Sequence, residues 1–234
     1  MAGGKKSALG INTTIKTIDN ETGELVDAKY YVWSEVLLCS NCDAEVVFAD
    51  NALSSDYKKV SDEFNCKSCA SLLNKKKLEV VYEKVLDPYS NKVIERPKRV
   101  LSLVCFSRKR RNIIKKPDKY DLELIAKIEK LPLPKDFPSN QIPDMQMMRV
   151  GRMKPSKISQ MNHFYCDKTI HILAKLWSKC NEIEDYKLRD ALCYWVDSHF
   201  VNLSLRNRFR PGVSFPYNPM AGVFYLPMMC SEAN

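Results

Sequence analysis

Short hydrophobic runs occur through the first half of the chain, and their length and their β-branched or aromatic content are typical of β-strands. The run Tyr30–Leu38 leads into a Cys-x-x-Cys motif and Asp43–Phe48 leaves it, so these two segments predict the arms of a hairpin. Further strand-like segments follow at 78–85, 92–96, 100–106 and 112–114. The turn residues between these segments favour antiparallel neighbours, and we expect a small antiparallel sheet in this region.

The second half of the chain has apolar residues spaced three and four positions apart, which is typical of amphipathic helices. The spacing predicts one helix that opens at 118–121 and two more at about 167–180 and 185–203. Five prolines fall between residues 131 and 155, so this segment predicts an extended connector. The apolar run Gly222–Pro227 predicts a terminal strand, which needs a sheet to join.

The composition narrows the classes of function. The chain has 234 residues, of which 45% are hydrophobic and 28% are charged, as in an ordinary globular protein. It has only 7 glycines, and none lies between Gly23 and Gly151. Dinucleotide and adenosyl cofactors need clustered glycines, because the backbone must approach the ligand closely, so a loop of that kind is excluded. No apolar run has the length of a signal peptide or a membrane helix, and we expect a cytoplasmic protein without a membrane partner.

Two Cys-x-x-Cys motifs carry the strongest chemical signal. Cys39 and Cys42 form the first, and Cys66 and Cys69 form the second. Two thiolates at this spacing can reach one ion, and two such turns complete a tetrahedral site, so the motifs predict a zinc ribbon that binds Zn²⁺. Because thiolates fill all four positions, we expect the zinc to be structural. Two disulfides or a redox Cys-x-x-Cys pair are the alternatives.

These patterns together predict an α+β fold, in which a four-cysteine zinc ribbon and a small antiparallel sheet are followed by a helical region and a terminal strand. The remaining cysteines show no paired spacing and are interpreted as core residues: Cys105, Cys166, Cys180, Cys193 and Cys230. The expected divisions of the chain are an N-terminal segment at 1–29, the zinc ribbon at 30–73, a basic antiparallel β region at 74–119, a helix and proline-rich connector at 120–160, and the helical region with the terminal strand at 161–234.

Basic residues are concentrated in a few places. The formal net charge is +9. Basic residues outnumber acidic ones most strongly in the segment from Arg96 to Lys119. Lys and Arg neutralise phosphates, and Arg and Asn can bind base edges with two hydrogen bonds, so we expect DNA as a partner. The alternative is a solvated basic face without a ligand. The candidate nucleic-acid-binding residues are Arg108, Lys109, Arg110, Arg111, Lys115 and Lys116 in the β region, and Arg206, Asn207, Arg208 and Arg210 near the end of the chain.

Several short segments occur in an order that spans about residues 28–234. They are Tyr31–Val36, the two Cys-x-x-Cys motifs, Tyr82-Glu83, Asp87-Pro88, Lys98–Val100, Lys116–Ile125, Ile158–Tyr165, Arg206–Pro211 and Ala221–Pro227. In this order they resemble the zinc-ribbon-containing site-specific DNA methyltransferases of the adenine-N6/cytosine-N4 type. The resemblance implies S-adenosylmethionine as methyl donor and an exocyclic amino group of a flipped base as acceptor.

The chain departs from that family at its two catalytic motifs. It contains no Pro-Pro, so the [Asp/Asn/Ser]-Pro-Pro-[Tyr/Phe/Trp] motif is absent, and the Gly-rich cofactor loop is absent as well. Asp87-Pro88-Tyr89 and Asn218-Pro219-Met220 each lack the second proline. We therefore assign no catalytic and no cofactor-binding residue in this chain.

The sequence thus favours a fragment or subunit of a site-specific DNA methyltransferase, which contributes zinc-stabilised DNA binding and target recognition and is inactive alone. S-adenosylmethionine would then bind only in the complete enzyme, and the remaining methyltransferase segments or subunits would be partners. The alternative is a stand-alone zinc-ribbon protein that binds nucleic acid or acts as an adaptor.

Overall fold

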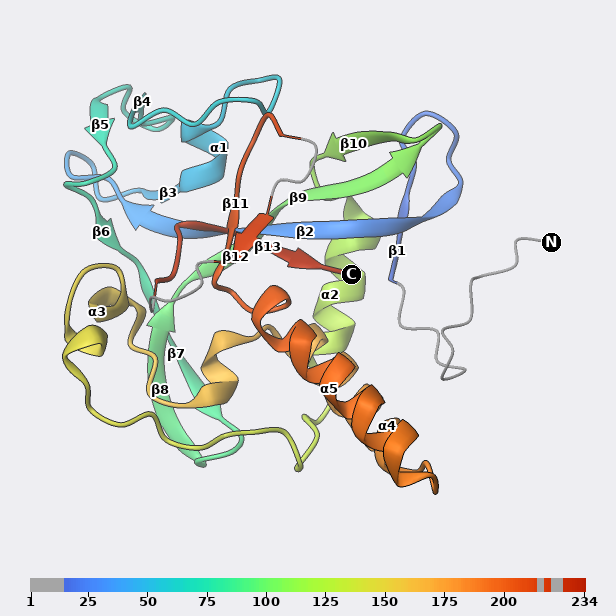
Figure 1. Ribbon diagram of the computed structural model, residues 1–234. Coiled ribbons are helices and arrows are strands. Elements are labelled where there is room, and N and C mark those ends of the chain that lie inside the picture. Colours follow the sequence, from blue (N-terminus) through green and yellow to red (C-terminus); the bar gives the residue numbers. More distant parts are fainter. Residues whose placement is uncertain (1–14, 214–216, 220–224) are drawn as a thin grey trace.

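An antiparallel sheet organises the chain (Figure 1). The computed structural model describes residues 15–213, 217–219 and 225–234. Among these residues, the main path of the sheet follows the order β10 (Arg111–Lys115), β9 (Arg99–Arg108), β2 (Leu25–Leu38), β13 (Met229–Ala233), β11 (Asn207–Phe209) and β12 (Tyr217–Pro219). Three short strands pair with β2 beside this path: β1 (Lys16–Ile18), β3 (Glu45–Val47) and β6 (Glu79–Val80). The strand β2 therefore joins the two halves of the sequence.

The side chains of residues 30–37 in β2 are buried on both faces of the sheet. Tyr30 and Val32 point into one hydrophobic cluster, and Tyr31 and Trp33 point into the other. Successive residues of a strand face opposite sides, so a strand covered on both faces needs an unbroken apolar run. This requirement explains why residues 30–38 are apolar except at Ser34 and Glu35.

The segment that carries the four cysteines, predicted above as a zinc ribbon and called the ribbon below, covers one face of the sheet. It consists of the end of β2, β3, α1 (Phe48–Ala52), β4 (Glu63–Asn65) and β5 (Leu72–Asn74). Phe48 packs edge-on against Phe64 with ring centroids 5.8 Å apart, and both rings belong to the cluster that contains Tyr30 and Val32. Ion pairs between Lys98 and Glu45 and between Lys116 and Asp50 add polar contacts to the neighbouring strands. The ribbon is thus continuous with the core.

The helix α2 (Lys119–Glu129) covers the opposite face. Asp118 caps it, because its carboxylate accepts from Asp121 N at 3.0 Å while Asp121 Oδ2 accepts from Asp118 N at 3.1 Å. Asp121 is buried and also accepts from Thr17 Oγ1 at 2.6 Å. The helix thereby positions Ile125 against the sheet.

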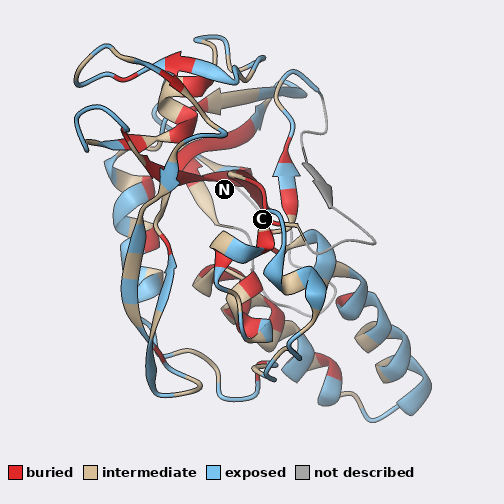
Figure 2. Cartoon of the chain, turned by 90° about the vertical axis from the view of Figure 1, so that its left-hand side faces the viewer, coloured by how far each residue is buried: buried red, intermediate tan, exposed pale blue. Residues whose placement is uncertain are grey.

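The remaining elements lie beside the sheet. The strands β7 (Tyr82–Asp87) and β8 (Lys92–Pro97) form a separate hairpin, and α4 (Asp167–Asn181) and α5 (Tyr186–Asn202) form a helical hairpin with its own apolar cluster. Between α2 and α4 the chain forms three short helices, η1 (Gln146–Arg149), α3 (Met153–Ser156) and η2 (Met161–Phe164). Figure 2 shows buried residues concentrated in the central strands, whereas α5 is mostly exposed and buries Val196 alone.

A buried carboxylate holds the connector against the sheet. Glu35 of β2 accepts from Arg99 Nη2 at 2.8 Å and forms a second ion pair with Arg152, just before α3. The Glu35 side chain is 2% exposed, so both guanidinium groups compensate a charge that water does not reach.

The expected elements and the observed ones agree locally but differ in how they assemble. The predicted hairpin around Cys39, the later strands and the three helices are present. The expected small sheet over 74–119 is instead divided, because β9 and β10 join the large sheet through β2 while β7 and β8 remain apart. The terminal strand is observed at 229–233 rather than at 222–227, of which residues 222–224 lie outside the described residues.

The last of these strands is locked in place by Glu232. Its Oε2 accepts from Trp33 Nε1 at 2.8 Å, and its Oε1 accepts from Thr169 Oγ1 at 2.6 Å. Lys168 Nζ lies 3.6 Å from the same carboxylate and donates to the carbonyl of Ala233 at 3.1 Å. Both charged side chains are at most 3% exposed, so each depends on the other for compensation.

We predict that Glu232→Ala lowers the free energy of unfolding by about 3–5 kcal/mol, because it leaves the Lys168 ammonium buried and uncompensated. Urea unfolding followed by tryptophan fluorescence measures the loss. The double variant Lys168→Met/Glu232→Met removes both charges and should recover part of it. Equal destabilisation in the single and double variants would show that the ion pair is not the source.

Candidate metal centre

The first Cys-x-x-Cys turn is built by the hairpin between β2 and β3. Cys39 N donates to Ala44 O at 3.0 Å, and Asp43 N donates back to Cys39 O at 3.0 Å. Asn41 N points at Cys39 Sγ at 3.5 Å, and Asp43 has a positive φ of 56°. Such a turn directs both sulfur atoms to the same side and supplies amide donors to a thiolate.

The second turn, between β4 and β5, repeats this geometry. Cys66 N donates to Ser71 O at 2.9 Å, and Ala70 N donates to Cys66 O at 2.8 Å. Ser68 N points at Cys66 Sγ at 3.4 Å, and Ala70 has a φ of 59°. Two hairpins of unrelated sequence therefore adopt the same turn, which supports a shared role in binding one metal ion.

The four sulfur atoms converge on one point. Cys39 Sγ lies 3.8 Å from Cys69 Sγ, and Cys42 Sγ lies 3.9 Å from Cys66 Sγ. All four sulfur atoms lie within 4.8 Å of one another. Sulfur atoms bound to one tetrahedral zinc at about 2.3 Å are separated by about 3.8 Å, so the arrangement fits a closed shell of four thiolates. The residues predicted as ligands from the sequence are thus the ones that the structure brings together.

Hydrogen bonds and neighbouring sulfur atoms set the protonation of the free cluster. Bonds with Ser71 Oγ at 3.3 Å and with Asn41 Nδ2 at 3.5 Å lower the pKa of Cys69 to about 5. For Cys42, a backbone hydrogen bond at Ala44 lowers the pKa, but hydrogen bonding with Cys69 and other sulfur atoms raises it to about 12. Four thiolates this close together repel one another, and a divalent cation removes that repulsion.

Two disulfides, one alternative for the Cys-x-x-Cys motifs, are not observed in the part of the chain that the structure describes. All nine cysteines are free, and the short sulfur–sulfur distances are far longer than the bond of about 2.05 Å in a disulfide. Cys105, Cys180 and Cys230 are buried, as expected for core residues. Burial raises the pKa of Cys230 to about 12, which keeps it a thiol. Within the described residues, the four ribbon cysteines are the group whose ligand atoms could hold a metal ion.

Two of the predicted nucleic-acid contacts form ion pairs with acidic residues of this chain. Arg108 pairs with Asp19 at 3.2 Å and with Glu21 at 2.5 Å. Lys115 is buried between Asp118 and Asp121, at 2.5 and 2.9 Å. These cations are neutralised by carboxylates of other elements, so they brace the fold.

Two further candidate nucleic-acid-binding residues are also engaged within the protein or buried. Lys116 is exposed but forms an ion pair with Asp50, and Asn207 is fully buried in β11. The half-buried Arg206 lies at the edge of the helical hairpin. The Asn207 amide does not face solvent, so it is not available to a base edge of bound DNA.

A second set of predicted contacts is exposed and has no ion-pair partner among the residues that the structure describes. Lys109, Arg110 and Arg111 form the tip of the β9–β10 hairpin, and Arg208 and Arg210 lie in and just after β11. These five cations are among the exposed positions whose positive charge has no acidic partner in the described part of the chain.

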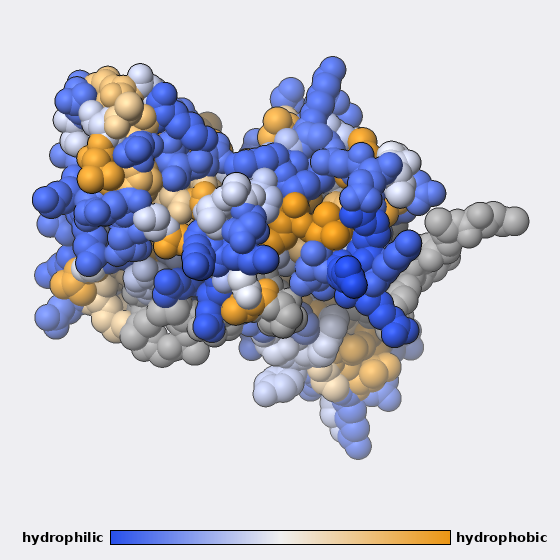
Figure 3. All heavy atoms as spheres, turned by 90° about the horizontal axis from the view of Figure 1, so that it is seen from above, coloured by the Kyte–Doolittle hydropathy of each residue, from blue (hydrophilic) through white to orange (hydrophobic). Residues whose placement is uncertain are grey.

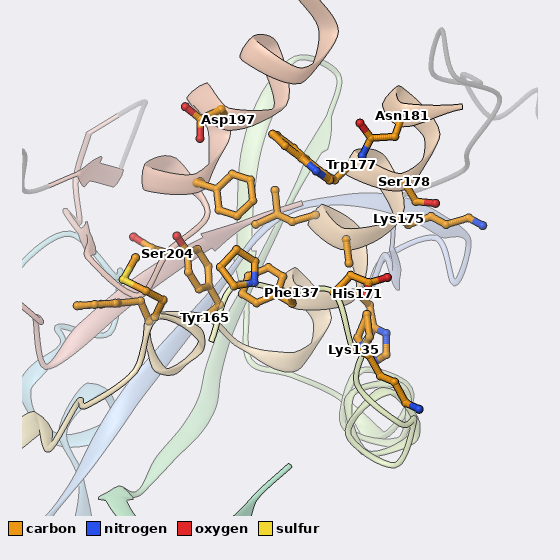
Figure 4. A pocket seen from close by; sticks show the side chains of 18 of the residues that line it. Lys135, Phe137, Tyr165, His171, Lys175, Trp177, Ser178, Asn181, Asp197 and Ser204 are labelled. Carbon is orange, nitrogen blue, oxygen red and sulfur yellow. The ribbon is translucent and has the colours of Figure 1, made fainter. Parts of the chain in front are cut away.

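The helical hairpin contains a cavity that sequence analysis did not identify. It has a volume of about 1300 Å³ and lies between α4, α5 and the segment around Phe137. Figure 4 shows Phe137, Tyr165 and Trp177 around it, with the ammonium groups of Lys135 and Lys175 directed away. Its walls come from α4, α5, the segment around Phe137 and the segment of η2 and Tyr165, so the apolar spacing of the two helices alone did not predict a cavity between them.

Comparison with known proteins adds no relative. A scan against protein-family models gives no match, and searches of curated proteins and of solved structures find no similar chain. In the described part of the chain, no helix combines the length and the apolar character that a bilayer crossing requires.

We predict that the chain, purified under reducing conditions, contains about one zinc ion per molecule, and that Cys69→Ser abolishes retention of zinc. Chelator release with a colorimetric zinc assay measures the stoichiometry. Cys193→Ser is the matched control, because it removes a thiol outside the cluster and should leave the zinc content unchanged. Metal-free protein, or zinc lost equally from both variants, would contradict the assignment.

Proposed function

We propose that this chain is the zinc-stabilised DNA-binding region of a site-specific DNA methyltransferase of the adenine-N6/cytosine-N4 type. The single observation that carries the DNA-binding part is the set of five exposed cations without acidic partners in the described part of the chain, at the β9–β10 tip and on β11. Arg and Lys in such positions neutralise phosphates and release counterions, which favours a polyanion.

The role of the metal in this proposal is structural. A closed shell of four thiolates has no open position for a water or a substrate, so zinc would hold two hairpins together. The ribbon packs on the sheet that carries both groups of exposed cations. Zinc therefore supports the DNA-binding surface by fixing the fold beneath it.

The surface around these elements suits a solvated, charged ligand. Figure 3, which looks down on the ribbon and the β9–β10 hairpin, shows hydrophilic side chains over most of this face and apolar ones in small separate patches. Interfaces with DNA are more polar and more positively charged than interfaces between proteins. The face thus supports a nucleic acid as partner more than an apolar protein surface.

The methyltransferase part of the proposal rests on the ordered segments described in the sequence, from Tyr31–Val36 to Ala221–Pro227. S-adenosylmethionine would supply the methyl group in the complete enzyme. No Pro-Pro sequence and no glycine cluster of the cofactor-loop type occurs in this chain, so its own residues would bind and orient DNA. A stand-alone zinc-ribbon protein would share the binding surface but would need no methyltransferase partner.

We predict that the zinc-loaded chain binds duplex DNA with an affinity that falls linearly on a log–log plot of binding constant against salt. The variant Arg208→Gln/Arg210→Gln should lower the magnitude of that slope by about 2, because two phosphate contacts are lost. Fluorescence anisotropy with a labelled duplex measures both quantities.

The matched control for this experiment is Lys127→Gln/Lys130→Gln. It removes the same charge from exposed positions at the end of α2 and should leave the slope unchanged. Binding that does not weaken with salt, or an equal loss in both variants, would contradict the proposed surface.

A separate prediction concerns chemistry. The isolated chain, incubated with duplex DNA and S-adenosylmethionine labelled in its methyl group, should transfer no label to the DNA, because it lacks the motifs that hold the base and the cofactor. Scintillation counting of the recovered DNA measures the transfer. Labelled DNA would overturn the claim that the chain is inactive alone.

A further inference from the structure

The tip of the β9–β10 hairpin has an unusual backbone for its sequence. Arg108 pairs with Arg111, so the loop between the strands contains two residues, Lys109 and Arg110. Their φ angles are 47° and 65°. A two-residue hairpin loop with two positive φ angles is a type I′ turn, which strongly prefers Asn-Gly because other side chains are strained there.

Single large residues with positive φ occur elsewhere, at Tyr57 (57°) and Lys157 (51°), but a pair of them in one two-residue turn is particular to the tip within the described residues. The chain places Asn91, with a φ of 54°, in the β7–β8 turn, and Gly23, with a φ of 72°, in the turn before β2. Lys109 and Arg110 are the only consecutive non-glycine residues with positive φ in the described part of the chain. Two long cationic side chains therefore occupy positions where the fold alone favours small residues.

The base of the same hairpin is held rigidly. Arg108 pairs with Asp19 and Glu21 of the turn before β2. Lys29 Nζ donates to Asn112 Oδ1 at 2.7 Å, which links β2 to the far side of the hairpin. A braced base means that the tip loses little conformational entropy when it binds a ligand.

We propose that the β9–β10 tip enters the major groove of duplex DNA, where Lys109 and Arg110 contact base edges and Arg111 contacts the backbone. This inference rests on the proposed DNA-binding function. It identifies the β9–β10 tip as the element that recognises the base sequence, called the reading element below. Strain at a turn persists where function requires the residues that cause it.

The dimensions and the chemistry favour this groove. Paired strands lie about 4.8 Å apart, and a two-stranded ribbon fits the major groove of B-form DNA, which is about 12 Å wide. Arg and Lys side chains there donate to guanine O6 and N7, the commonest base-specific contact. The deep, narrow major groove of A-form RNA does not admit a ribbon, so duplex RNA should compete poorly.

Two variants separate strain from charge. Lys109→Asn/Arg110→Gly installs the residues that the turn prefers, so it should lower the unfolding equilibrium constant by about tenfold and raise the urea midpoint. Lys109→Gln/Arg110→Gln keeps long side chains at both positions and should leave the midpoint nearly unchanged. Lys127→Gln/Lys130→Gln serves again as the charge-matched control on α2.

The probe is a labelled duplex DNA pool with a randomised central segment, tested by anisotropy and by sequencing of the bound fraction. The unaltered chain should enrich guanine-containing sites. Both tip variants should bind about tenfold more weakly or worse and lose that enrichment, while the α2 control retains both. Duplex RNA should displace the probe far less well than unlabelled duplex DNA.

The outcomes distinguish this inference from the proposed function. If the unaltered chain does not bind DNA at all, the proposed function fails. If it binds and the tip variants keep its affinity and enrichment, DNA binding stands and the tip is not the reading element. If Lys109→Asn/Arg110→Gly does not raise the urea midpoint, the turn is not strained and the argument from strain is overturned.

Discussion

The structure depends on burial of β2 on both of its faces. A strand in that position must satisfy its backbone hydrogen bonds on both sides, because water does not reach it. β9 supplies one neighbour, and β13 and the short strands supply the other contacts. The continuation of β2 carries the first cysteine turn, and β9 continues into the basic tip. The candidate metal centre and the proposed DNA-binding hairpin are thus two extensions of one central pair of strands.

Buried carboxylates connect this pair of strands to the rest of the chain. Glu35 of β2 holds the connector through Arg152, and Glu232 of β13 joins Trp33 of β2 to Lys168 and Thr169 of α4. Removing one partner from such a site leaves a buried charge without compensation, which is strongly destabilising. The same chemistry explains why Arg108 and Lys115, although basic, belong to the interior framework rather than to the free surface.

Local features of the fold could be predicted from the sequence, whereas long-range features could not. The cysteine spacing predicts the metal ligands because each tight turn brings its two sulfur atoms to the same side. The helices and most strands follow from their periodicity. Pairing of β2 with β9 and β13 depends on contacts between distant segments, which no local pattern encodes. The burial of Asn207 and the pairing of Lys115 with Asp121 likewise depend on neighbours that only the fold provides.

The place of β13 has a consequence for synthesis of the protein. Trp33 and Glu232, which face each other across β2 and β13, are 199 residues apart in the chain. At translation rates of about 5–20 residues per second, β13 is synthesised roughly 10–40 s after β2, and until then the edge of β2 that pairs with β13 has no neighbour. During that interval a long, apolar strand has an open edge, which is the kind of segment that associates with other unfinished chains. Yield during expression should therefore depend on how well the cell shields nascent β2, independently of the stability of the finished fold.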